Sequence, residues 1–364
     1  MSLVPRHIQD LESYKPGLNI AEVQKEFGLD QIIKLASNEN PMGPSPKALE
    51  AVQKTLHDNF RYPDAAALLL REKLAEKFSL NIKNVTVGAG SEGVMSAIMR
   101  TFLRVGDEII AADNSFIGFR VLANASGIRT NWVPLNHYCH DLPAMTEYIN
   151  NYTKIIYLAN PDNPTGTYFT VKEFDTFMSQ VPDRVLVILD EAYFEYAEHL
   201  KDYPDSMHYR YDNVITLRTF SKAHGLAGFR AGYGFAHENL IKNLMKVKLP
   251  FEPSWPAQVA AMAALDDVSY IKQTVSLCHK EMKRLMVVFQ EMGIEIIPSA
   301  ANFLTLIFED EQEAASFSKA ILQRGVILRH LSGWGHKDCI RITVGTEEEN
   351  RYFLQQLSSI LQIS

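Results

Sequence analysis

The sequence contains few cysteines, no long apolar run and no secretory leader pattern. Its three cysteines are scattered and odd in number, so they give no disulfide framework and favour a reducing compartment. The longest apolar stretch, residues 259–265, is far shorter than the roughly 20 residues of a membrane-spanning helix. Residues 1–10 carry charges and a proline in place of the apolar segment of a signal peptide. We therefore expect a cytosolic protein that does not span a membrane.

Acidic residues outnumber basic residues, and this charge balance limits the kinds of molecule that the protein is expected to bind. The 36 Lys and Arg residues stand against 43 Asp and Glu residues, for a formal net charge of −7. This balance argues against nucleic acids and anionic membranes, because both are bound by basic surfaces. With 364 residues, 46% of them apolar, the chain is long enough for two hydrophobic cores. Small molecules are then the expected ligands.

Short β-branched runs alternate with longer amphipathic segments between residues 84 and 235. This alternation predicts an α/β fold with a mostly parallel, doubly wound sheet. Residues 185–189 are apolar on both faces, which predicts a central strand between two helix layers. The predicted strands are 84–87, 108–111, 155–158, 185–189, 214–217 and 231–235.

The rest of the chain predicts a second, smaller α/β domain. Apolar positions recur at helical spacing over 257–292, which predicts one long or kinked helix. Prolines and a glycine crowd residues 41–46 and mark the end of an N-terminal arm, which we expect to associate with the small domain. The predicted small-domain strands are 303–307, 326–328 and 340–344, with helices at 311–323 and 347–361. The predicted division is an arm at 1–45, a large domain at 46–255, and a linking helix with the small domain at 256–364.

A glycine-rich turn follows the first predicted strand. Residues 88–93 read Gly-Ala-Gly-Ser-Glu-Gly and open a predicted helix, so their backbone N–H groups and the helix dipole suit a phosphate. The spacing also matches the dinucleotide fingerprint, and Asp113 supplies the acid expected at a ribose. The fingerprint alone is weak, because any tight strand-to-helix turn recruits glycine. An NAD(P)-dependent dehydrogenase is therefore one open interpretation.

Polar residues gather after the later strands, at the sheet edge where open α/β sheets bind ligands. Asp190 directly follows five apolar residues, and a buried carboxylate needs a cation or a strong donor beside it. A protonated pyridine nitrogen is such a partner, and a nearby lysine, Lys222, can form a Schiff base with an aldehyde. Tyr193 and Asn163 can donate hydrogen bonds to a ring oxygen beside that bond. Together these groups describe a site for pyridoxal phosphate.

The phosphate and the ring face of that cofactor have candidate partners as well. A pyridine ring favours an aromatic side chain stacked on its face, and Phe116 is placed either for this role or for the core. The pairing of Lys222 with Asp190 favours this cofactor over a nicotinamide, because a nicotinamide site needs neither residue. The predicted phosphate ligands are the side chains of Thr219, Ser221 and Arg230 with the backbone amides of Gly90, Ser91 and Glu92.

An ordered series of motifs along nearly the whole chain resembles the fold-type I pyridoxal-phosphate aminotransferases, most closely the members that act on histidinol phosphate. The resemblance implies that Lys222 holds the cofactor covalently and that Arg230 binds its phosphate. It also implies a homodimer in which Tyr62 reaches the cofactor phosphate of the neighbouring subunit. The motifs are Tyr-Lys-Pro-Gly at 14–17, Lys-Leu-Ala-Ser-Asn-Glu-Asn-Pro at 34–41, Arg-Tyr-Pro-Asp at 61–64, Asn-Pro-Thr-Gly at 163–166, Asp-Glu-Ala-Tyr at 190–193, Ser-Lys-Ala at 221–223, Gly-Leu-Ala-Gly-Phe-Arg at 225–230 and Arg-Ile-Thr-Val-Gly at 341–345.

The same resemblance implies a substrate site for anions. Arg341 stands where the family binds its substrates, and a planar guanidinium pairs with either a carboxylate or a phosphate. Arg329 ends the preceding predicted strand and is expected either to assist or to form a surface salt bridge. Tyr14 and Asn40 in the arm are expected to contact the substrate. His224 replaces a frequent phenylalanine of the family, a change that removes no chemical function.

The expected reaction transfers the amino group of L-histidinol phosphate to 2-oxoglutarate. It yields imidazole-acetol phosphate and L-glutamate, a step of histidine biosynthesis, and Lys222 is expected to be the base at the substrate Cα. An aromatic amino-acid or phenylpyruvate aminotransferase is the nearest alternative, because the same arginine admits either anion. A phosphothreonine-type decarboxylase is more distant.

Two further groups of residues are interpreted as structural. His137, Cys139 and His140 are adjacent but lack the spacing of a zinc motif, so no metal site is expected. Trp334 and His336 lie in a glycine-flanked loop that could border the substrate pocket or be plain surface, and plain surface is the expectation.

Overall fold

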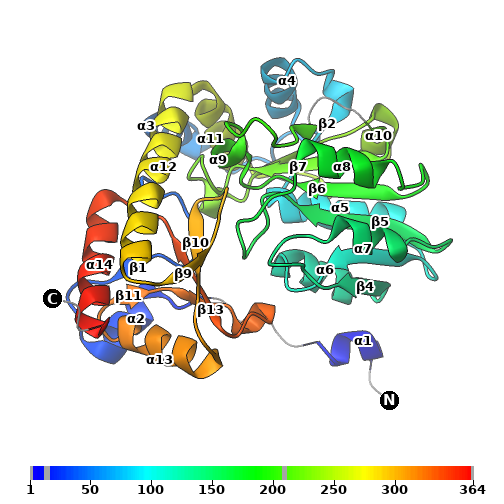
Figure 1. Ribbon diagram of the computed structural model, residues 1–364. Helices are drawn as coiled ribbons and strands as arrows, with labels where there is room; N and C mark the ends of the chain where they lie inside the picture. Colours follow the sequence, from blue (N-terminus) through cyan, green and yellow to red (C-terminus); the bar gives the residue numbers. More distant parts are fainter. Residues whose placement is uncertain (1–2, 12–16, 207–210, 362–364) are drawn as a thin grey trace.

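A seven-stranded sheet forms the centre of the larger part of the protein (Figure 1). The computed structural model describes residues 3–11, 17–206 and 211–361. The strand order is β2-β8-β7-β6-β5-β3-β4, in which β8 runs antiparallel to both of its neighbours and the other pairings are parallel. The predicted α/β class and mostly parallel sheet are therefore confirmed. The strands are β2 (Val85–Gly88), β3 (Glu108–Ala112), β4 (Arg129–Val133), β5 (Thr153–Ala159), β6 (Leu186–Asp190), β7 (Val214–Thr219) and β8 (Gly232–Phe235).

Helices cover both faces of this sheet. On the central strand β6, Ile188 packs against the helices on one face of the sheet. Val187 and Leu189 pack against the helices on the opposite face. The side chains of a strand alternate between faces, so a strand covered on both sides must be apolar throughout, as residues 185–189 are. One layer contains α5 (Gly90–Phe102), α6 (Ile117–Ser126) and α10 (Glu238–Val247), and the other contains α7 (Leu142–Glu147) and α8 (Val171–Met178).

One strand of this sheet was not predicted. β4 pairs only with β3 and lies at the sheet edge. Its residues Arg-Thr-Asn-Trp-Val alternate weakly and are mostly half-buried, because an edge strand keeps water along one side. The apolar pattern that marks the buried strands is therefore missing here.

A four-stranded antiparallel sheet lies beside the first sheet, in the order β12-β13-β10-β9 (Figure 1). The N-terminal segment joins this side of the molecule, because β1 pairs in parallel with β11. The division of the chain at 45 and 255 stays a prediction. The elements are β1 (Ile33–Lys34), β9 (Glu295–Ile297), β10 (Phe303–Ile307), β11 (Val326–Ile327), β12 (Arg329–His330) and β13 (Cys339–Thr343), with α2 (Ile20–Phe27), α12 (Val268–Glu291), α13 (Glu311–Leu322) and α14 (Glu347–Leu361).

The long or kinked helix predicted over 257–292 is two helices in the structure, because the chain breaks at Asp267. α11 (Trp255–Asp266) ends there and α12 begins at the next residue. Asp267 has a non-helical conformation (φ −92°, ψ 60°), and its carboxylate accepts a hydrogen bond from Ser269 Oγ at 3.0 Å. Asp267 stands at the N-cap position of α12, but its carboxylate bonds this hydroxyl and no backbone N–H of the first turn. α11 then packs on α3 (Pro46–Thr55) and α4 (Leu68–Lys77).

The remaining described elements are short. They are the helices α1 (Arg6–Gln9) and α9 (Phe194–Ala197) and the 3-10 turns at Leu56–Asp58, Ile82–Asn84, Ala227–Phe229 and Ser332–Trp334. None of the helices in the described part of the chain combines the length and the apolarity that crossing a bilayer requires.

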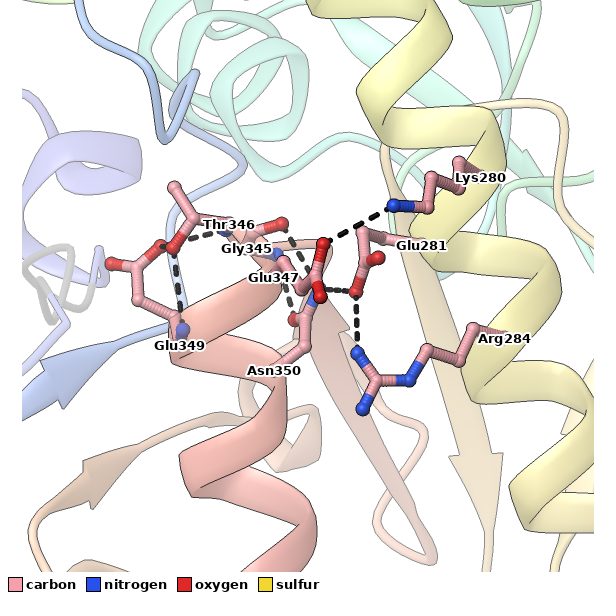
Figure 2. A network of polar contacts seen from close by, with 8 residues as sticks. All are labelled: Lys280, Glu281, Arg284, Gly345, Thr346, Glu347, Glu349 and Asn350. Atoms are coloured by element: carbon pink, nitrogen blue, oxygen red, sulfur yellow. Dashed lines mark hydrogen bonds and ion pairs between the residues drawn. The ribbon is translucent and has the colours of Figure 1, made fainter.

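A buried polar network attaches the start of α14 to α12, directly after β13 (Figure 2). Glu281 on α12 is fully buried, and its carboxylate accepts from Asn350 Nδ2 at 3.1 Å. Asn350 also donates to the Gly345 carbonyl at 2.9 Å and accepts from the Gly345 amide at 3.0 Å. Lys280 and Glu347 form an exposed ion pair at 3.1 Å beside it. The network fixes the path of the chain where it leaves β13.

Asn350→Ala is therefore expected to destabilise the protein. The change leaves both polar groups of Gly345 without the partner they have in Asn350, and it leaves the buried Glu281 carboxylate with Arg284 Nη1, at 3.4 Å, in place of two donors, at a cost of about 2 to 4 kcal/mol. Denaturant unfolding monitored by circular dichroism measures this as a lower midpoint. Lys280→Ala is the matched control, because an exposed ion pair contributes less than about 1 kcal/mol. Equal midpoints for the two variants would contradict the structural role of the network.

Candidate active site

A cavity of about 200 Å³ opens at the carboxyl ends of β5, β6 and β7. Parallel strands end at one edge of the sheet, so the loops that follow them bring together residues that are far apart in the sequence. The cavity is lined by most of the residues predicted for the cofactor: Ser91, Glu92, Phe116, Asn163, Asp190, Tyr193, Thr219, Ser221, Lys222 and Arg230.

Asp190 ends β6 at the floor of the cavity. Its side chain is buried, and Oδ2 accepts a hydrogen bond from the Tyr157 hydroxyl at 2.9 Å. Oδ1 is buried and has no hydrogen-bond partner among the described residues. Burial raises the pKa of this carboxyl from 3.8 to about 7. A charged N–H group placed against Oδ1 would both satisfy the oxygen and stabilise the ionised form.

Lys222 lies in the loop after β7 and lines the cavity. Its Nζ is 3.4 Å from the Ser37 carbonyl oxygen and 5.6 Å from the centroid of the Tyr193 ring. Burial and the nearby cations Arg341 and Arg230 lower the pKa of this amine to about 8. An appreciable fraction of Lys222 is therefore neutral near pH 7, and a neutral amine is a nucleophile.

The start of α5 and the side chain of Arg230 form a cradle for an anion. Gly90 has φ +75°, which strains a larger residue, and a Cβ atom there would lie 2.8 Å from Arg230 Nη2 and displace the guanidinium. Arg230 Nη1 is 3.4 Å from Ser221 Oγ, which is 3.0 Å from Thr219 Oγ1. Hydroxyls, a guanidinium and the amides of a helix N-terminus are the groups that bind phosphate.

Arg341 on β13, in the smaller sheet, does not line the cavity itself but contacts Asn163, which does. It is 4% exposed, and its guanidinium donates to Asn163 Oδ1 and, at 2.8 Å, to the Ala36 carbonyl. Arg329 lies opposite Arg341 in the β12–β13 pairing. An anionic end of a substrate held by Arg341 would therefore lie next to Asn163 and the cavity.

Three predicted site residues do not line the cavity or lie outside the described residues. Asn40 uses its side chain to bind the protein itself, donating to Ala223 O at 2.9 Å and Thr274 Oγ1 at 3.2 Å and accepting from Met42 N at 3.0 Å. Tyr62 is 82% exposed and stacks on Phe251 at 4.5 Å, so it does not line the cavity of its own chain. Tyr14 lies outside the described residues. Their contacts with substrate and cofactor stay predictions.

Sequence reasoning missed three residues at the site. Asn38 donates to the Tyr193 hydroxyl at 2.9 Å, and its φ of 56° is a conformation that asparagine tolerates. Tyr157 was taken only as part of a strand, although a buried hydroxyl needs a partner. Trp334 is not plain surface: it is 6% exposed and lies against the guanidiniums of Arg329 and Arg341.

The model of the aminotransferase class I and II family matches residues 30–357. The chain belongs to this family. It is 42% identical over 361 residues to histidinol-phosphate aminotransferase 2 of Hydrogenovibrio crunogenus, covering 98% of this chain and 96% of the relative. It is 41% identical to histidinol-phosphate aminotransferase 2 of Carboxydothermus hydrogenoformans, covering 99% and 100%.

Solved structures agree with this aminotransferase assignment. The crystal structure of histidinol-phosphate aminotransferase from Sinorhizobium meliloti in complex with pyridoxal 5′-phosphate has a TM-score of 0.89 and 27% identity, covering 100% of this chain and 98% of that one. The protein is therefore an aminotransferase that uses pyridoxal phosphate. The dehydrogenase interpretation is wrong, and Asp113, its predicted ribose ligand, forms an ion pair with Arg120.

The cavity of this aminotransferase fits pyridoxal phosphate. Oδ1 of Asp190, which no described residue hydrogen-bonds, matches a protonated ring nitrogen, and the lowered pKa of the Lys222 amine matches an aldehyde partner. The cradle that a Cβ on Gly90 would fill matches the phosphate. Phe116 and Tyr193 line the same cavity, where the ring would lie.

Proposed function

We propose that this aminotransferase transfers the amino group of L-histidinol phosphate to 2-oxoglutarate, a step of histidine biosynthesis. Relatives about 40% identical over the whole chain bear the name of that activity. The observation that carries the proposal is the buried Arg341, which donates to Asn163 at the cavity and lies opposite Arg329. Guanidiniums at this place suit both the phosphate of one substrate and a carboxylate of the other. The reaction would take place in the cytosol, as the scattered cysteines predict.

The residues divide the chemistry among them. Pyridoxal phosphate supplies an aldehyde that accepts the amino group and a ring that withdraws electrons from the substrate. Asp190 keeps a proton on the ring nitrogen, because its buried charge is stabilised by that cation. Tyr193 and Asn163 donate hydrogen bonds to the ring oxygen. Thr219, Ser221, Arg230 and the amides at 90–92 bind the phosphate.

Lys222 has two tasks in this proposal. Its amine would hold the cofactor through the aldehyde, and as a free amine it would act as the base for the proton on the substrate Cα. The side chain stays tethered at the site between these tasks, which keeps the base in reach of the reacting carbon. Arg341 orients the substrate so that this Cα–H bond faces Lys222.

Single-turnover spectroscopy tests the proposed substrates. The enzyme with its cofactor is mixed with histidinol phosphate, glutamate, phenylalanine or tyrosine, and conversion of the bound cofactor to its amine form is followed by absorbance. We expect fast conversion with histidinol phosphate and glutamate and slow conversion with the aromatic amino acids. Faster conversion with the aromatic amino acids would reassign the enzyme to aromatic transamination.

We further propose that the active form is a homodimer. Several large apolar side chains are exposed between residues 56 and 69 and at 249–251, a clustering typical of an interaction surface. Tyr62 is at this surface, 82% exposed, so in a dimer it would be available to the neighbouring subunit's cofactor phosphate. The exposed residues are Leu56, Phe60, Tyr62, Leu68, Leu69, Leu249 and Phe251.

Tyr62→Phe is expected to weaken cofactor binding about tenfold without dissociating the dimer. The change removes one hydrogen bond to a charged phosphate and keeps the aromatic ring against Phe251. Equilibrium dialysis of pyridoxal phosphate measures the affinity, and sedimentation measures the assembly. Tyr152→Phe, at another exposed tyrosine, is the control. Unchanged affinity in Tyr62→Phe would remove Tyr62 from the phosphate site.

A further inference from the structure

Arg329 and Arg341 face each other across β12 and β13. The antiparallel register pairs the two residues directly, so their side chains leave the same face of the sheet with Cβ atoms roughly 5 Å apart. Like charges in such a pair destabilise the strand pairing. Arg341 is 4% exposed, and the low dielectric around a buried charge strengthens the repulsion. Arg341 donates to Asn163 Oδ1 and to the Ala36 carbonyl, which are neutral acceptors, and a group that attracts both cations would further stabilise the pair.

Trp334 is such a group. The Cζ atom of Arg329 lies 4.7 Å from the centroid of the Trp334 ring, and that of Arg341 lies 5.7 Å from it. An indole ring attracts cations within about 6 Å, and more strongly when the pair is shielded from water. One buried ring therefore contacts both guanidiniums.

The ring is held in place from two sides. Trp334 ends a 3-10 turn and packs in a small apolar cluster with Leu331 and Cys339. The next residue, Gly335, has φ +92°, and a side chain there would collide with the side chain of Asn114. The turn is thus fixed against the loop that follows β3, which leaves Trp334 little freedom to turn away from the arginines.

We propose that Trp334 is a positioning residue that keeps Arg329 and Arg341 together as a two-guanidinium site, which favours a phosphate dianion over a single carboxylate. A dianion between two cations gains attraction from both, whereas a carboxylate is satisfied by one. The inference rests on the proposed function, because it assigns the substrate preference of the same site. It makes Trp334 a determinant of the choice between histidinol phosphate and aromatic amino acids.

Trp334→Leu removes the ring and tests the proposal. Without it the two guanidiniums move apart, so we expect the KM for histidinol phosphate to rise about tenfold. The KM for phenylalanine should change less than about threefold, and kcat with either substrate should stay within a similar factor. Trp334→Phe keeps an aromatic face and should restore most of the affinity for histidinol phosphate.

Trp132→Leu is the matched control. It removes a ring that contacts a different arginine, Arg120, with Cζ 4.5 Å from the ring centroid, on edge strand β4 away from the site. A rise in the KM for histidinol phosphate as large as that of Trp334→Leu would overturn the proposal. An equal rise in the KM for phenylalanine in Trp334→Leu would overturn it too, because the effect would then not depend on the dianion.

Fluorescence gives a readout that needs no turnover. The chain has three tryptophans, so the double variant Trp132→Phe/Trp255→Phe leaves Trp334 as the only emitter. Titration with inorganic phosphate should change its emission saturably, and Arg329→Leu in the same background should abolish the change. Emission that does not change with phosphate concentration would overturn the proposal. This test remains available if the Trp334→Leu variant does not fold. If the unsubstituted enzyme does not convert histidinol phosphate, the proposed function is refuted. The role of Trp334 would still stand or fall by the phosphate titration, because that titration does not depend on turnover.

Discussion

Replacing Lys222 with alanine is expected to lower the turnover number by at least about 10³-fold. The change removes both the amine that bonds the cofactor and the base at the substrate Cα, and general base catalysis alone contributes about 10² to 10⁴-fold. The protein should also lose the visible absorbance of covalently held cofactor. Stopped-flow kinetics and absorbance spectra measure the two effects.

Lys222→Arg is the matched control, because it keeps the positive charge but forms no such bond. Borohydride reduction followed by mass spectrometry of the unsubstituted enzyme should find the added cofactor mass on the peptide that contains Lys222. The mass on another lysine, or substantial turnover in Lys222→Arg, would refute the assignment.

The pH dependence of cofactor attachment follows from the same amine. Burial and two neighbouring arginines lower its pKa to about 8, so the neutral fraction rises tenfold per pH unit below pH 8 and levels off above it. The rate at which cofactor-free enzyme bonds pyridoxal phosphate should follow this curve. A rate still rising at about pH 10 would indicate an ordinary exposed lysine.

Replacing Asp190 with asparagine is expected to lower turnover by about 10² to 10³-fold. Asparagine keeps the shape but removes the charge that holds a proton on the ring nitrogen, and loss of one such electrostatic contact costs this much. The absorbance of the bound cofactor should shift as well, because the ring changes its protonation. Asp183→Asn, at an exposed position, is the control. Turnover in Asp190→Asn within about threefold of the control would refute the role.

Asp190 should also affect the stability of the cofactor-free protein. Its folded-state pKa is raised from 3.8 to about 7, so the folded protein binds this proton more tightly than the unfolded chain does. The stabilising contribution is complete below about pH 4 and is lost as the pH rises through 7. Thermal unfolding between about pH 5 and pH 8 should therefore show a larger loss of stability in the unsubstituted protein than in Asp190→Asn.

The residues at the ends of the buried strands could be predicted from the sequence, because continuous apolar runs mark those strands. Asp190, Asn163 and Lys222 follow such runs, and parallel topology brings strand ends to one edge. The edge strand β4 and the break at Asp267 lack a comparable signal, since exposure weakens the first pattern and helical spacing continues across the second.

The parts of the site that depend on the direction of side chains could not be predicted from the sequence. The register that sets Arg329 opposite Arg341 is decided by the pairing of two short strands, so the residue numbers alone do not reveal it. The position of Trp334 depends on the turn before Gly335, and that of Asn38 on a left-handed backbone in the arm. Asn40, a neighbour of Asn38, lies in the same short arm segment, yet its side chain faces the protein interior.

The pairing of the arm with the C-terminal strands has a consequence for synthesis of the protein. Asn38 exchanges hydrogen bonds with Thr343, and Arg341 donates to the Ala36 carbonyl, partners that are 305 residues apart in the chain. Asn163 therefore gains its contact with Arg341 only after β13 has left the ribosome, and Asn38, the donor to Tyr193, gains its contact with Thr343 at the same stage. A nascent chain has Lys222 and the phosphate cradle before β13 is translated, but the Arg341 side of the pocket only afterwards, so a chain stopped before β13 should not form the completed pocket.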